Sequence, residues 1–331
     1  MKKLIATLLV TGLLLFLLVA SLFLRIERSP VENLEEATMR LTFEGEFSVN
    51  SVSDGNGEPR ITWAAVQSLN YPEESKYLEI IDFGASEPYV VGEDEFGNHY
   101  VVLNFSNPVF GINKYKIWTT VRTSKITVAD ITTSLDSIHQ DFMNSNPMTQ
   151  SDDPLVKNTA VAATQESISQ SEKVKHVSEW VFNNIEYDLA LEHETLDAVW
   201  TLQNQRGVCV EMSHTAEAML KSLDIPARHV YGAAPYNFPS GWQEHTWVEA
   251  YIGKWIPLDP TWDETEYLDP AHVTFARVPD QTFVEEKVSV SGRNIKMGEM
   301  VLPVMTVEIL NEKRGKEPIY VKLFGKKFKI R

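Results

Sequence analysis

The spacing of apolar positions predicts a β-rich region over residues 39–143. Leu41, Phe43 and Phe47 alternate with polar residues, and short runs of β-branched and aromatic residues follow. Turn signals separate these runs, at Asp54-Gly55-Asn56-Gly57, Glu95-Phe96-Gly97-Asn98 and Asn107-Pro108. Short strands at this spacing, without a helical period between them, are typical of a small β-sandwich.

A helical period begins after a polar connector that starts at residue 144. Ser169-Gln170-Ser171-Glu172 is a capping-box pattern, and the apolar residues that follow it keep helical spacing: Val174, Val177, Val181 and Ile185. Thr195 is predicted to cap a short helix that contains Leu196, Val199 and Trp200. A third helix is predicted after Gly207, with Cys209 in its first turn.

Strands follow the helices, at residues 227–232, 245–252 and 255–259, and Gly253-Lys254 is predicted to form a hairpin turn. Helices followed by antiparallel strands indicate an α+β core, which we place at residues 144–262. Residues 263–331 are predicted to form a β-rich extension with a basic tail. The tail from residue 312 has eight basic and two acidic side chains, which suggests either an edge strand protected by lysines or a contact with anionic polymer or lipid.

The N-terminus carries an apolar segment long enough to cross a membrane. Residues 4–24 are 21 uncharged, mostly apolar residues between Lys2-Lys3 and Arg25. We therefore predict a single-pass anchor at 1–28, a stalk at 29–38 and an extracytoplasmic remainder. The alternative is a cleaved signal peptide, but residues 18–20 lack the small-x-small pattern of a cleavage site. In both alternatives, the remainder of the chain is exported.

Composition narrows the possible chemistry. The chain has 30 Lys and Arg against 46 Asp and Glu, a formal charge of −16, which disfavours nucleic acid as a partner. A single cysteine, Cys209, excludes an internal disulfide and makes a cysteine-based zinc site very improbable. No cofactor and no metal are predicted, and the sequence gives no oligomeric state.

Cys209 has the surroundings of a nucleophile. At the start of a helix, unpaired N–H groups and the helix dipole favour the thiolate. His245 begins a strand, and pairing across Gly253-Lys254 would bring Asp259 near Trp247, within reach of the His245 ring. Asp259 would then orient the imidazole. His214 is the rival base, but it lies five residues after Cys209 and points away from it.

Several segments together resemble the transglutaminase-like superfamily, in the form of its bacterial membrane-anchored members. The segments that carry the resemblance are Ser151–Pro154, Trp180, Ile185–Asp188, Gly207–Cys209, Asp224–Gly232, His245–Glu249 and Trp255–Thr261. The resemblance covers about residues 150–262 and implies a papain-related fold with a Cys209–His245–Asp259 triad. It also suggests Gln203 as an oxyanion donor beside the Cys209 N–H, although Asn204 and Gln205 are equally possible.

The resemblance implies an exported cysteine enzyme that performs acyl transfer or hydrolysis on a protein or peptide carboxamide through a thioester. The partners expected from an extracytoplasmic location are cell-envelope proteins or peptides, and residues 4–24 are expected to contact the membrane. The alternative function is a non-catalytic binding or scaffold module that retains the fold. Thiol reactivity separates the two, since a nucleophilic thiolate reacts faster than a buried inert thiol.

The topology can be tested on intact cells. We expect protease added outside, after removal of any outer envelope, to degrade residues 39–331, because long domains translocate largely regardless of charge. A mature N-terminus near Ser21 or Leu22 and release into the medium would contradict the anchor.

Overall fold

The computed structural model describes residues 33–52, 57–131, 138–237, 241–265, 267–315, 320–323 and 326–329. The predicted anchor at residues 1–28 and the first part of the stalk lie outside the described residues. Among the residues that are described, no helix is both long and apolar enough to cross a membrane.

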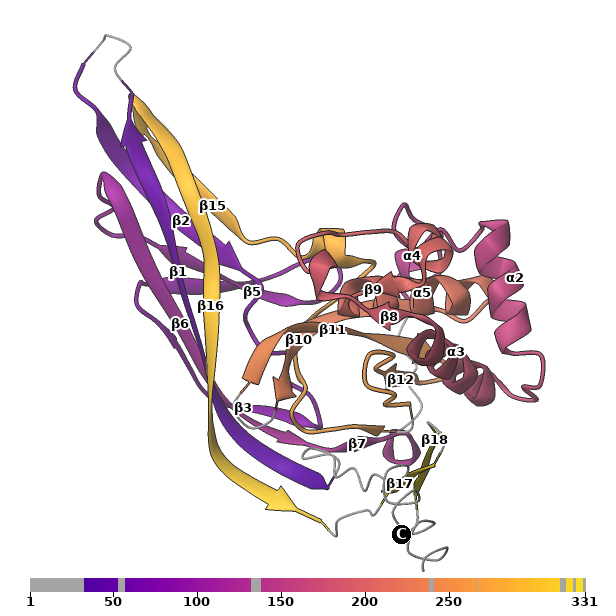
Figure 1. Cartoon of the computed structure of the whole chain (residues 1–331). Helices are drawn as coiled ribbons and strands as arrows, with labels where there is room; N and C mark the ends of the chain where they lie inside the picture. Colours follow the sequence, from indigo (N-terminus) through magenta and orange to yellow (C-terminus); the bar gives the residue numbers. More distant parts are fainter. Residues whose placement is uncertain are drawn as a thin grey trace, which may run out of the picture.

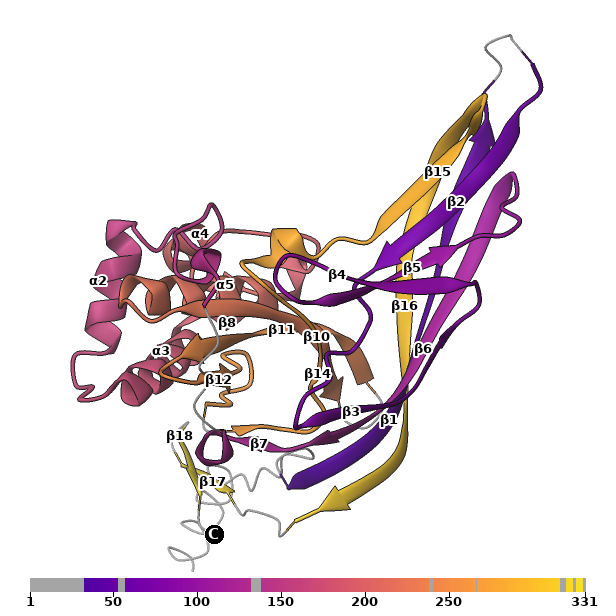
Figure 2. The same cartoon turned by 180° about the vertical axis from the view of Figure 1, so that it is seen from behind.

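Two four-stranded antiparallel sheets form the β-rich part of the molecule (Figures 1 and 2). The first sheet has the order β16-β1-β6-β3, with bounds Ile295–Arg314, Leu34–Ser51, Gly111–Ser124 and Leu78–Ala85. The second has the order β15-β2-β5-β4, with bounds Lys287–Arg293, Arg60–Ser68, His99–Asn104 and Tyr89–Glu93. Leu41, Phe43 and Phe47 of β1 are buried, as their alternation predicts.

The C-terminal strands return to the N-terminal ones. β16 pairs with β1 along most of its length, with Leu41 opposite Val307, and β15 pairs with β2, with Val66 opposite Val288. Residues 287–314, expected within a C-terminal extension, therefore complete the sheets that residues 34–124 begin. In the basic tail, β17 (Tyr320–Leu323) pairs with β18 (Lys326–Lys329).

In the described part of the chain, four α-helices precede the central strands: α2 (Pro154–Ala163), α3 (Gln170–Asn184), α4 (Ala198–Asn204) and α5 (Cys209–Ser222). The predicted capping box of α3 is present, with Ser169 and Glu172 each bonding the other's backbone N–H at 3.2 Å. The prediction for α4 is wrong by two residues. Asp197, not Thr195, is the N-cap, because its carboxylate accepts the Trp200 N–H at 2.7 Å.

A four-stranded antiparallel sheet lies between the helices and the long strands. Its order is β12-β11-β10-β14, with bounds Trp255–Leu258, Gly241–Tyr251, Ala227–Asn237 and Val273–Val278. Val248 and Leu258 pack against Met219 of α5 in one buried cluster. The opposite face joins the β-rich core, where Phe275 meets Phe43 edge-to-face at 5.6 Å. The sheet thus connects the helices to the sandwich.

Short elements complete the described chain. Two-residue strands pair as β7 with β13 and as β8 with β9, at Ile126–Thr127, Tyr267–Leu268, Glu186–Tyr187 and Arg206–Gly207. Single 3-10 turns lie at Val128–Asp130, Gln140–Phe142, Leu189–Leu191 and Gln281–Phe283. The parallel β8–β9 pair matters for the site, since it places Tyr187 opposite Gly207, two residues before Cys209.

Candidate active site

Cys209, His245 and Asp259 come from three elements that the fold brings together. Cys209 is the first residue of α5, His245 lies within β11, and Asp259 follows β12 directly. His245 Nε2 lies 2.8 Å from Asp259 Oδ2. The three residues are 8%, 1% and 0% exposed. The chain therefore holds these groups together in a nearly dry environment.

The β11–β12 hairpin sets the position of Asp259. Val248 pairs with Leu258, so the next residue, Asp259, lies beside Trp247, as the predicted turn required. Gly253 has φ +81° in that turn, a conformation that glycine adopts at little cost. The hairpin thus places the carboxylate two residues along β11 from His245.

The start of α5 is fixed by a buried carboxylate. Glu211 accepts the N–H of Val208 and that of Leu196, each at 2.9 Å. A Cβ on Gly207 would lie 2.4 Å from the Glu211 Cβ, so any side chain at 207 would displace this cap. Gly207 has no positive φ, so the glycine is required here by close packing against Glu211 rather than by its backbone conformation.

Charge at the site favours a thiolate and an imidazolium. Burial would raise the pKa of Cys209, but hydrogen bonding to His245, its positive charge and contacts from Thr246 together lower it. Burial would lower the pKa of His245, but Asp259 and Cys209 raise it to about 9. The pKa of Asp259 is held well below its usual range, since the charge and hydrogen bond of His245 outweigh burial.

The two ring nitrogens of His245 have separate partners. Nε2 pairs with the Asp259 carboxylate, and among the described residues Nδ1 has no other hydrogen-bond partner. Nδ1 is therefore the nitrogen left to exchange a proton with the thiol. The Trp262 ring lies against the imidazole, with ring centroids 4.3 Å apart and planes 8° from parallel. The Trp247 ring lies farther from the imidazole, with ring centroids 6.1 Å apart.

Trp262 belongs to a short loop that also orients Asp259. Two backbone hydrogen bonds join Asp259 and Glu264, at 2.7 and 3.1 Å, and close the loop. Within it, Asp259 Oδ1 accepts the Thr261 N–H at 2.7 Å. The loop therefore fixes the carboxylate and places the indole over the ring that the carboxylate holds.

Tyr187 and Gln243 are polar residues near the thiol that sequence reasoning did not place in the site. Burial and the negative charge of Cys209 raise the pKa of Tyr187 to about 12, and its hydroxyl contacts both Cys209 and Gln243. The Tyr187 side chain remains 41% exposed. The sequence gives an indication of each residue. Gln243 lies two residues before His245, and Tyr187 lies in the Ile185–Asp188 segment that follows α3.

His214, the rival base, has partners other than Cys209 in the structure. His214 Nδ1 lies 2.9 Å from the Leu196 carbonyl oxygen, and Nε2 accepts the Gln281 N–H at 3.2 Å. Burial and then the charge of His229 lower the pKa of His214 to about 4, so the ring is neutral. His214 thus has its partners outside the Cys209, His245 and Asp259 group. Gln203 is exposed on α4 and stays a prediction as oxyanion donor.

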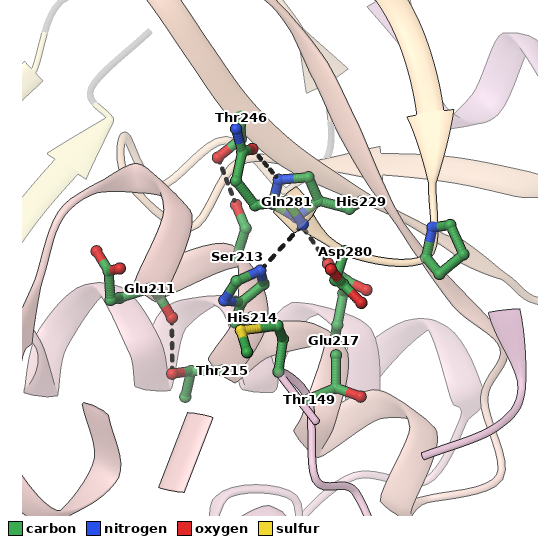
Figure 3. A network of polar contacts seen from close by, with 12 residues as sticks. Thr149, Glu211, Ser213, His214, Thr215, Glu217, His229, Thr246, Asp280 and Gln281 are labelled. Carbon is green, nitrogen blue, oxygen red and sulfur yellow. Dashed lines mark hydrogen bonds and ion pairs between the residues drawn. The ribbon is translucent and has the colours of Figure 1, made fainter. Parts of the chain in front are cut away.

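His214 belongs to a second buried network on the same helix (Figure 3). Glu217 Oε1 lies 2.9 Å from His229 Nδ1, and His229 Nε2 lies 3.0 Å from the Gln281 side-chain oxygen. Lys221 Nζ lies 3.4 Å from the other Glu217 oxygen. This network links α5 to β10 and to the Gln281–Phe283 turn, and it supports the helix that carries the nucleophile.

Side chains of metal-ligating type cluster twice among the described residues, with ligand atoms within 4.8 Å of one another: His245, Asp259 and His272, and Glu264, Asp269 and His272. In both groups, histidine nitrogens lie within ion-pair distance of carboxylate oxygens, at 2.8 to 3.4 Å. Because the histidine nitrogens of both groups pair with carboxylate oxygens, we assign both groups to one network of hydrogen bonds and ion pairs rather than to metal sites.

Comparisons with known proteins identify the fold that carries this site. A model of the transglutaminase-like superfamily matches residues 157–260. A structure from Cytophaga hutchinsonii, described as that of a candidate cysteine protease, is 20% identical with a TM-score of 0.61, over 88% of this chain and 95% of that one. At this identity the likeness shows the fold. An uncharacterized protein of Mycobacterium leprae (strain TN) is 30% identical over 120 residues, which span 32% of this chain and 42% of that relative.

The lowered pKa of Cys209 can be measured by alkylation. We expect the iodoacetamide rate to have its inflection well below the value for a free thiol, about 8.5. In His245→Ala the inflection should rise toward that value, because the hydrogen bond and the positive charge of His245 are lost while burial still raises the pKa of the thiol. Each mass increase reports Cys209, the single cysteine of the chain.

A matched control is His193→Ala, because His193 is exposed and lies on a different segment. It should leave the inflection unchanged. A wild-type inflection at or above the free-thiol value would refute the activated nucleophile.

Proposed function

We propose that this chain, whose residues 157–260 form a transglutaminase-like domain, is a cysteine enzyme that cleaves or transfers acyl groups. Cys209 is the nucleophile, His245 the general acid and base, and Asp259 the residue that orients His245. The observation that carries the proposal is the 2.8 Å contact between His245 Nε2 and Asp259 Oδ2, with Nδ1 left for a thiol of lowered pKa.

The first half-reaction follows from the charges of the site. The Cys209 thiolate attacks the carbonyl carbon of a carboxamide and forms a carbon–sulfur bond, while the carbonyl oxygen takes the negative charge. When the carbon–nitrogen bond breaks, the His245 imidazolium gives its Nδ1 proton to the leaving nitrogen. Ammonia or an amine departs, and a thioester with Cys209 remains.

The second half-reaction returns the proton. Neutral His245 takes a proton from water or from an amine, which attacks the thioester carbon and displaces the thiolate. Water gives hydrolysis and an amine gives a new amide bond. In both cases Cys209 and His245 return to their starting charges, and Asp259 stays ionised throughout, since its pKa lies well below the usual range.

Two donors stand beside the sulfur to receive the charge on the carbonyl oxygen. The Cys209 N–H lies at the first position of α5, where no intrahelical acceptor is available. The Tyr187 hydroxyl contacts the sulfur and is bonded to Gln243. Donors placed in advance around a developing oxyanion commonly contribute a factor of about 10²–10³ each to the rate.

Export accords with this chemistry. The apolar run at residues 4–24 supports a tether to the cell membrane with the domain outside, and envelope proteins or peptides are then the available substrates. A strongly acidic chain gives no support for nucleic acid as a substrate.

Trapping of the thioester tests the proposal. We expect a peptide with an internal glutamine, or a p-nitrophenyl ester, to add an acyl mass to Cys209 that Cys209→Ala does not acquire. Asp259→Asn should remain folded and acylate about 10²–10⁴ times more slowly, because the imidazole loses its orientation. Addition of a small primary amine during turnover then separates the outcomes, since transamidation yields an amide and hydrolysis an acid.

Turnover above about a tenth of the wild-type rate in Cys209→Ala would contradict the nucleophile, because loss of such a residue typically costs several orders of magnitude. An unreactive wild-type thiol would instead favour the binding module.

A further inference from the structure

Asp259 is held by two histidines, not one. Its Oδ2 atom lies 2.8 Å from His245 Nε2 and 3.2 Å from His272 Nε2. His272 directly precedes β14, which packs beside β10, so it reaches Asp259 from a different part of the sheet. The two imidazole rings have centroids 5.9 Å apart. His272 has no role in the steps above.

The far side of His272 is also acidic. Its Nδ1 atom lies 3.4 Å from Asp269 Oδ1, and His272 is 5% exposed. Asp269 is itself held in place, because its Oδ1 accepts the Ala271 N–H at 2.6 Å and its N–H bonds Glu264 at 3.0 Å. A ring with a carboxylate at each nitrogen favours the doubly protonated, positively charged form.

We propose that His272, supported by Asp269, is a positioning residue of the catalytic centre: it fixes the Asp259 carboxylate and supplies a second buried positive charge that lowers the pH at which the Cys209 thiolate forms. This inference rests on the triad proposed above. It extends that triad into a buried row of alternating charges, from Cys209 through His245, Asp259 and His272 to Asp269.

The charged groups around His272 agree with this role. Asp259, Asp269 and Glu264 face it from the loop after β12 and from the segment before β14, and His245 faces it from β11. Burial and the negative charge of Asp269 raise the pKa of Glu264 well above its usual value, so Asp259 and Asp269 supply the negative charge around the ring. Across a cavity of about 260 Å³ lie Lys76, Arg228, Glu249 and Arg277. Burial would lower the pKa of His272, but Asp269 and Asp259 raise it well above the usual value.

The sign of the effect follows from electrostatics. A neutral side chain in place of the His272 imidazolium removes a positive charge next to Asp259. The remaining negative charge then disfavours the thiolate, so the pKa of Cys209 rises. For a buried charge separated from the thiol by His245 and Asp259, a shift on the order of one pH unit is expected.

His272→Gln separates this role from packing. The Gln amide retains a donor for Asp259 and carries no charge. We expect the variant to fold, and the inflection of the iodoacetamide rate at Cys209 to move up by about one pH unit relative to wild type. If the Gln variant does not fold, His272→Asn is the second neutral replacement, with the same expectation.

The matched control is His229→Gln. His229 is equally buried and also has partners at both ring nitrogens, but these are Glu217 and Gln281, away from the triad. We expect this control to change stability and to leave the inflection in place.

The outcomes separate the two proposals. A depressed wild-type inflection that is the same in folded His272→Gln overturns the role of His272 and leaves the triad intact. An upward shift in His229→Gln as large as that in His272→Gln overturns the role as well, since both would then reflect packing. A wild-type inflection at the free-thiol value refutes the proposed function itself.

Discussion

The site depends on the hydrogen bond between His245 Nε2 and Asp259 Oδ2, because it decides which charges the buried centre can hold. Burial of an isolated imidazolium or thiolate away from water has a large free-energy cost, and an opposite charge beside it offsets that cost. Asp259 stabilises the protonated His245, and His245 in turn stabilises the Cys209 thiolate. Loss of the carboxylate would leave burial to favour the neutral forms of both, and a neutral thiol is a poor nucleophile.

Much of the surrounding structure serves to hold these three groups still. Glu211 fixes the start of α5, the β11–β12 hairpin fixes the register of Asp259, and the loop that follows closes on Glu264 and places Trp262 over the imidazole. The central sheet, buried on both faces, joins this centre to the β-sandwich. That rigidity suits a catalytic constellation, since small displacements of its groups cost large factors in rate.

Sequence patterns predicted the structural features that depend on residues close together in the chain. The α3 capping box, the helix start at Cys209 and the hairpin that aligns Asp259 each depend on residues a few positions apart. The pairing of β16 with β1 joins residues between 244 positions apart (Ser51 and Ile295) and 280 positions apart (Leu34 and Arg314), and the pattern of neither strand identifies its partner. Likewise, His272 and Tyr187 reach the centre only through sheet order and the β8–β9 pairing, so the sequence placed neither in the site.

The charge state of His245 tests the account most directly. Nitrogen-15 NMR of ring-labelled histidine reports how many ring nitrogens carry protons. The account predicts that both His245 nitrogens are protonated in the wild type at pH 7, with titration near pH 9, and that the pKa falls in Cys209→Ala, where the thiolate charge is absent. A His245 that is neutral at pH 7 in the wild type, or a pKa unchanged by removal of the thiol, would contradict the buried ion pair from which the mechanism follows.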